Sequence, residues 1–161
     1  LLEETDENGE IKNDSDLIKD DSVDSGWINL FLLLPIVLLT IPGIGANIAS
    51  GIIGEIGNIS NFKNTDSLLA YAGLDPKVYE SGKFKAKSTP ITKHGSSYLR
   101  NALIQASRII VKHDSTFKNY FHKKIDESKS YNCSIGHVSK KLVRVIFSIL
   151  KNNKEFISLN N

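Results

Sequence analysis

The stretch Ile41-Pro-Gly-Ile-Gly45, followed directly by Ala46–Ile56, decides the fold. A run of uncharged, mostly apolar residues precedes the turn. The two glycines permit positive φ and let another chain approach closely. After the turn, apolar side chains recur at helical spacing. The pattern therefore predicts two helices joined by a tight glycine turn, a helix-hairpin-helix-like element over residues 28–57. The apolar positions of its second helix are Ala49, Ile52, Ile53 and Ile56.

This turn also indicates a chemistry. Amide N–H groups at the start of a helix, together with the helix dipole, suit a phosphate. Gly43 and Gly45 are therefore candidate contacts to a nucleic-acid backbone, a mode of binding that does not read bases. An ordinary helical hairpin with a glycine turn fits the same residues. No Lys or Arg lies between residues 25 and 62, so the electrostatic support for an anion here is weak.

The apolar run before the turn has two interpretations. Hydropathy makes residues 27–45 a candidate membrane segment, because about 20 apolar residues span a bilayer. Pro35 interrupts the run and Pro42 ends it before that length is reached. We therefore expect residues 27–40 to form a helix packed on the domain or on a partner surface. Attachment to a membrane stays as the alternative.

The charges of the chain are divided between two parts. The net charge of the 161 residues is +2. Residues 1–26 contain ten acidic and two basic side chains, whereas residues 27–161 contain eight acidic and eighteen basic ones. An acidic segment with few large apolar residues cannot bury enough surface to fold. We predict a disordered segment over 1–26 and a basic domain over 27–157, whose charge favours an anionic partner, nucleic acid first.

The remaining chain predicts a mostly α-helical fold. Apolar stripes at helical spacing indicate helices over 66–72, 96–113, 115–125 and 134–152. We expect Thr65 or Asp66 to cap the first of these helices and Gly73 to end it, and Ser96 to cap the second. Residues 74–95 lack helix signals and are expected to be an irregular loop or a short β-hairpin. In this segment lysines alternate with aromatic residues, which suits contact with nucleic acid. The candidates there are Gly82, Lys83, Lys85, Lys87 and Lys93.

Catalytic groups are sparse in the basic domain. Its carboxylates are scattered, so no two-metal site can be assembled from them. The four histidines share no metal-ligand spacing, and Cys133 has no evident activating partner. Ser81, between Glu80 and Gly82 in the basic segment, is the one nucleophile to consider. A serine hydroxyl is weak without a base or metal, and the residues alone fit a loop serine better.

An ordered set of motifs resembles a known family. It runs through Ile41-Pro-Gly-Ile-Gly45, Leu69-Ala-Tyr-Ala-Gly-Leu-Asp-Pro76, Ser81-Gly82, Ile91-Thr-Lys-His-Gly95 and Tyr98-Leu-Arg-Asn-Ala-Leu103. This order resembles the C-terminal domain of the serine-and-DEDD transposases of bacterial insertion sequences, relatives of the pilin-gene-inverting recombinase. The resemblance covers residues 41–156. Thr92-Lys-His-Gly-Ser96 departs from the family's frequent Ser-Lys-Arg-Gly-Asn.

The resemblance implies a function in DNA recombination and transposition. It assigns Ser81 as the serine nucleophile. It also implies that Lys93, Gly95 and Arg100, in the family's turn and the helix after it, contact nucleic acid. It implies Mg²⁺ on a resolvase-like N-terminal domain that we do not find in this chain. The expected partners are DNA, a guide RNA where the system uses one, and further copies of the complete protein. We expect this chain to hold no cofactor, to be inactive alone, and to act in the cytoplasm at the nucleoid.

Two other functions stay open at this point. One is a non-catalytic nucleic-acid-binding helix-hairpin-helix module. The other is a small protein attached to a membrane through residues 27–45. Covalent capture of DNA by Ser81 separates the transposase from the binding module, and membrane fractionation separates both from the third.

Overall fold

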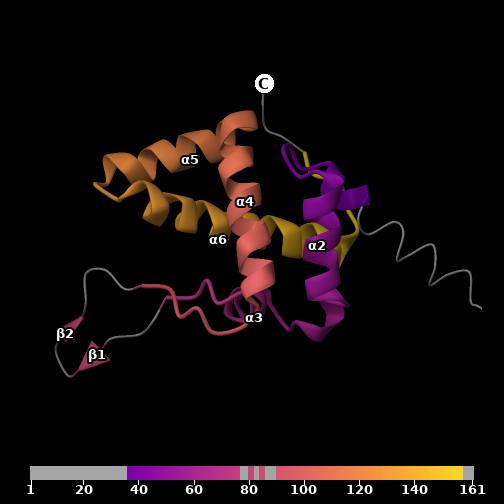
Figure 1. Ribbon diagram of the computed structural model, residues 1–161, viewed down its shortest axis with the longest axis horizontal. Coiled ribbons are helices and arrows are strands. Elements are labelled where there is room, and N and C mark those ends of the chain that lie inside the picture. The colour runs from indigo at the N-terminus through magenta and orange to yellow at the C-terminus, as the bar shows by residue number, and fades with distance from the viewer. Residues whose placement is uncertain (1–35, 77–79, 82–83, 86–89, 158–161) are drawn as a thin grey trace, which may run out of the picture. The chain divides into compact units, whose positions relative to one another are not determined.

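Helix α4 (Ser97–His113) lies at the centre of the fold, as Figure 1 shows. The computed structural model describes residues 36–76, 80–81, 84–85 and 90–157. α4 packs against α2 (Ala46–Ile56), α5 (Ser115–Asp126) and α6 (Tyr131–Asn152). Its buried side chains recur every three or four residues, so one face meets the core. They are Leu99, Leu103, Ala106, Ser107 and Ile110.

The longest helix, α6, forms the other half of the core. Its N-cap is Ser130, whose hydroxyl accepts a hydrogen bond from the backbone N–H of Cys133 at 3.4 Å. The sequence-based start at residue 134 is therefore wrong by one turn. Apolar periodicity marks the buried face, whereas the first turn of α6 is partly solvent-exposed and carries no such signal.

A buried pair of hydroxyls joins α4 to α6. Ser107 Oγ donates to the carbonyl of Leu103 at 2.7 Å, and Ser139 Oγ donates to Ser107 Oγ at 2.9 Å. Both serines have no solvent exposure. Because each hydroxyl has a partner, neither leaves an unsatisfied polar group in the core. The hydrogen bond between the two serines therefore joins α4 to α6 inside the core.

The predicted glycine turn lies in the same core. Residues 36–39 are helical, residues 40–45 form the turn, and α2 follows. Leu38 and Ile41 are fully buried, whereas Ile36 and Leu39 stay exposed. The hydroxyl of Thr40 accepts a hydrogen bond from the backbone N–H of Phe156 at 2.9 Å, which ties the turn to the C-terminal segment.

One structural finding bears on the alternative that residues 27–45 attach the protein to a membrane. Within the described ranges, no helix has both the length and the apolar character needed to cross a bilayer. Residues 27–35 lie outside those ranges, as does the predicted disordered segment 1–26.

A short 3₁₀ helix, η2 (Ile59–Asn61), and helix α3 (Thr65–Tyr71) follow α2. We expected Thr65 or Asp66 to cap α3. The cap is instead Asn64, which forms a capping box with Ser67, so the prediction was wrong. The side chains of Asn, Thr and Asp can all accept this hydrogen bond, and the local sequence does not decide between neighbours. Gly73 has φ +64°, the left-handed conformation expected just beyond a helix end.

The fold class is confirmed, because the described residues are mostly helical. Two short strands, β1 (Glu80–Ser81) and β2 (Phe84–Lys85), pair antiparallel within the 74–95 segment. Glu80 lies opposite Lys85, and Ser81 lies opposite Phe84. The next contact between the two arms of this segment is an isolated bridge from Pro76 to Ile91.

Candidate nucleic-acid interface

A hydrogen-bonded stem closes the segment that contains β1 and β2. Residues 71–76 form one arm and residues 91–96 the other. The second arm reaches the first through three backbone hydrogen bonds of 2.8–3.1 Å. A side-chain bond from Thr92 Oγ1 to Asp75 Oδ1 adds to them. The stem therefore closes the segment that contains the strand pair, next to the helical core. The three backbone donors and acceptors are Thr92 N to Asp75 O, Lys93 N to Gly73 O, and Ser96 N to Tyr71 O.

Arg100 forms hydrogen bonds with both arms of the stem. Its Nη1 donates to the carbonyls of Ala72 at 3.2 Å and Lys93 at 3.3 Å, one on each arm. Ser96 caps α4 and donates to Glu55 of α2, so the same junction is tied to a third element. The structure thus gives Arg100 a role inside the fold. Its predicted contact to phosphate stays a prediction.

Two glycines allow the stem arms to approach. Gly95 has φ +97°, and a Cβ there would overlap the carbonyls of Tyr71 and Ala70. A Cβ on Gly73 would overlap the carbonyl of His94. Lys93 adopts φ +58°, an uncommon conformation for a residue with a side chain. The predicted turn at Lys93-His94-Gly95 is therefore a crossing at which its backbone lies very close to that of residues 70 and 71.

The structure places part of the predicted site. Ser81 and Lys85 lie in the paired strands β1 and β2, and nothing is described of their side chains. Gly82, Lys83 and Lys87 lie outside the described residues.

The two glycines of the first turn have different surroundings. Gly43 has φ +87°, and a Cβ there would overlap Ile109 of α4. The close approach that it permits is therefore to helix α4 of the same chain. Gly45 is the N-cap of α2, with no side-chain cap bond and open space where a Cβ would be. The predicted phosphate contact at this helix start stays a prediction.

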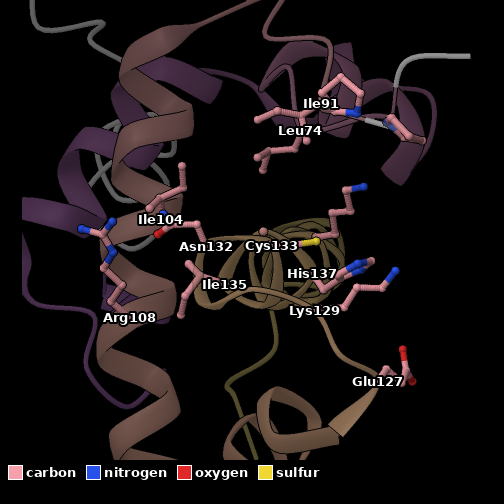
Figure 2. A pocket seen from close by; sticks show the side chains of 14 residues that line it. Leu74, Ile91, Ile104, Arg108, Glu127, Lys129, Asn132, Cys133, Ile135 and His137 are labelled. Carbon is pink, nitrogen blue, oxygen red and sulfur yellow. The ribbon is translucent and has the colours of Figure 1, made fainter. Parts of the chain in front are cut away.

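A cleft of about 880 Å³ lies beside the stem. Its walls come from the stem, from α4, from α6 and from the turn that connects α5 to α6. Figure 2 shows Leu74 and Ile91 on one wall, Ile104 on a second, and Cys133 and His137 on α6. The basic residues that line it are Arg108, Lys129, His137 and Lys140.

The charges of the cleft are not balanced. Glu127 is the one acidic residue among its described lining residues, and its carboxylate is paired with Lys124 at 2.7 Å. Burial lowers the pKa of His137, and the charges of Lys140, Lys124 and Lys129 lower it further. Burial also lowers the pKa of Lys140, against a raising effect of Asp75. The lower pKa favours the neutral imidazole of His137, whereas a partly desolvated lysine such as Lys140 favours an anion beside it.

The crowding of His137 is measurable. We expect Lys140→Gln to raise the pKa of His137 toward its ordinary value, because the largest charge effect on the imidazole is removed while burial remains. NMR titration of the imidazole resonances gives the pKa of each variant. Lys118→Gln, an exposed lysine of α5, is the matched control and should leave it unchanged. An unchanged His137 pKa in Lys140→Gln would show that the two groups do not interact.

The described residues offer no set of metal ligands. Across 36–76, 80–81, 84–85 and 90–157, no group of three His, Cys, Asp or Glu side chains converges. The cationic lining of the cleft is the opposite of what a divalent metal requires.

A family model for the IS116/IS110/IS902 transposases matches residues 36–122, more than half of the chain. The match includes the glycine turn, the stem with β1 and β2, and helices α2 to α4. The chain belongs to this transposase family.

Individual transposase relatives agree with this assignment. The chain is 28% identical over 121 residues to the pilin gene-inverting protein of Moraxella bovis, covering 74% of this chain and 38% of that protein. It is 27% identical over 120 residues to the transposase for insertion sequence element IS1111A of Coxiella burnetii, covering 73% and 33%. It is 38% identical over 72 residues to the transposase for IS1328 of Yersinia enterocolitica, covering 45% and 21%. The chain thus spans little more than a third of the first of these relatives.

Sequence reasoning missed the cleft of this transposase-family chain. The sequence pattern indicates no site at His137, Cys133, Arg108 or Lys140. One signal was available, because Cys133, His137 and Lys140 recur at i, i+4 and i+7 and so share a face of α6. What faces them could not be inferred from spacing.

Proposed function

We propose that this chain is a C-terminal DNA-binding and recombination domain of a transposase, and that Ser81 is its serine nucleophile. The observation that carries the proposal is the stem. Its hydrogen bonds close the segment that contains Ser81, within the region that the family model matches. A closed segment supports this role, because the position of a nucleophile relative to the phosphate must be fixed.

The proposed step is a transesterification. The Oγ of Ser81 attacks the phosphorus of a DNA phosphodiester, and the new O–P bond replaces the bond to one sugar oxygen. That oxygen leaves as a hydroxyl after it takes up a proton, and the proton of the Ser81 hydroxyl passes to a base. Lys83 and Lys85 stabilise the charge on the phosphate. A second DNA end later resolves the phosphoserine bond.

In this proposal, the positive charge that activates the Ser81 hydroxyl is supplied by a metal ion bound outside this chain. The described residues supply no carboxylate set, so we assign Mg²⁺ to a resolvase-like domain outside this chain. When bound, the metal polarises the phosphate and the serine hydroxyl. DNA, a guide RNA where the system uses one, and further copies of the complete protein belong to the same proposal, with the cytoplasm as the compartment.

Trapping of a covalent adduct tests the proposal. The chain is joined to a resolvase-like domain of the same family and incubated with Mg²⁺ and labelled DNA, with guide RNA if required. We expect an adduct that survives denaturing electrophoresis and is abolished by Ser81→Ala. Noncovalent DNA affinity should change less than twofold, because one hydroxyl adds little to an interface with many phosphates.

Ser88→Ala is the matched control, since this serine lies in the same segment. It should leave the adduct intact. An adduct that persists in Ser81→Ala, or that peptide mapping places on another serine, contradicts the assignment of Ser81. DNA binding without any adduct would favour the non-catalytic binding module instead.

A further inference from the structure

We infer that the cleft beside the stem binds an unpaired nucleotide of single-stranded DNA. The inference rests on the proposed function for the identity of the polymer, and it adds a site that the motifs did not indicate. The carrying observation is the meeting of apolar walls and cations in one hollow of about 880 Å³.

The apolar walls are suited to a base. Leu74 and Ile91 contribute from the stem, and Ile104 and Ile135 contribute from α4 and α6. A base in a duplex is stacked and paired, so it cannot lie against such walls. A base in a single strand presents its flat face, and apolar side chains can hold it there. The volume falls in the range of sites for small molecules, about 300–1,000 Å³.

The cations are suited to the phosphate of the same nucleotide. Lys129 and His137 lie together at one side of the cleft in Figure 2, and the charges of Lys129 and Lys140 both act on the His137 imidazole. Glu127 cannot neutralise this group fully, because Lys124 already binds its carboxylate. A phosphate there would meet the charges of Lys129 and Lys140, and burial partly desolvates Lys140.

The position of the cleft connects it to the proposed chemistry. Pro76 and Ile91, the last bridged pair of the stem, both line it. These residues begin and end the segment that contains β1 with Ser81. A single strand of DNA that enters the cleft would thus lie next to the two ends of the segment that contains the proposed nucleophile.

Two variants remove the site in different ways. Lys129→Ala/Lys140→Ala removes two cations. Gly136→Leu fills the cleft without a change of charge, because Gly136 lines the cleft within α6 and a Cβ there meets nothing within 4 Å. Leucine is also a better helix former than glycine, so α6 should be retained. The charge-matched control is Lys118→Ala/Lys151→Ala, two exposed lysines that do not line the cleft.

Fluorescence anisotropy with the full 161-residue chain gives the first readout. The probes are a labelled single-stranded oligonucleotide, its duplex and an RNA of the same sequence. We expect both cleft variants to bind single-stranded DNA about tenfold more weakly and the duplex within twofold of wild type. The lysine variant should also reduce the slope of log K against log salt by about 1.4, for two phosphates.

Cys133 provides a second, direct readout. It is the single cysteine of the chain, is half-buried, and lines the cleft. We expect saturating single-stranded DNA to slow its reaction with a maleimide severalfold, while duplex DNA does not. Circular dichroism verifies that each variant is folded.

The outcomes separate the two proposals. Equal losses on single strand and duplex, an equal loss in the control variant, or a loss confined to RNA would overturn the nucleotide site. Wild-type chain that binds neither DNA would instead contradict the DNA-binding part of the proposed function. The adduct experiment with Ser81 does not depend on either cleft variant.

Discussion

Gly95→Ala is expected to reduce the free energy of unfolding by about 3 kcal/mol or more. The backbone at Gly95 has φ +97°, a conformation that costs a residue with a side chain about 1–3 kcal/mol. In addition, the new Cβ would overlap the carbonyls of Tyr71 and Ala70. These carbonyls belong to the end of α3 and to the stem, where the Ser96 N–H bonds to the Tyr71 carbonyl. They cannot move without breaking that contact.

Urea denaturation followed by circular dichroism measures this loss. The chain offers a matched control in α2, where Gly51 and Gly54 are exposed and a Cβ meets nothing within 4 Å. Alanine at either position should increase stability by about 0.5–1 kcal/mol, because glycine inside a helix has a greater entropic cost. A Gly95→Ala protein within 1 kcal/mol of wild type would show that the stem does not need this crossing.

Phe117→Ala is expected to cost about 3–5 kcal/mol, the usual range for removing a buried phenyl ring. Phe117 is 1% exposed in the core. Its backbone N–H donates to the Asp114 cap of α5, and Lys141 Nζ lies 5.1 Å from its ring centroid. Removal of the ring leaves a cavity beside α6 and takes away one of the two rings that Lys141 contacts, the other being Tyr120.

Thermal unfolding and urea unfolding should both show that Phe117→Ala is less stable than wild type. Tyr98→Ala is the control, since Tyr98 is 78% exposed on α4 and should change stability by less than about 0.5 kcal/mol. Similar losses in both variants would mean that α5 does not depend on its buried ring. The lysine at 141 gives a further comparison, because Lys141→Ala removes the cation and leaves the ring in place.

The helices could be predicted from the sequence because their signals are local. Apolar periodicity indicated α4, α5 and α6, and Ser96 was identified correctly as the cap of α4. Gly73 was expected to end α3, and it has the positive φ that this role requires. Errors occurred at the starts of α3 and α6. There the cap is an Asn or Ser side chain bonded to one backbone N–H, and several neighbouring polar residues could have done the same.

By itself, then, the sequence determined which segments are helical, which faces of them are buried, and the family resemblance that the matched region confirms. Only the tertiary structure decided that Arg100 turns inward to bind both arms of the stem. The same is true of the cleft, where Leu74, Ile104 and His137 meet from three separate elements. The physical reason is range: periodicity reports how a helix lies against the core, whereas a site depends on which distant segments pack together and on what charges they bring.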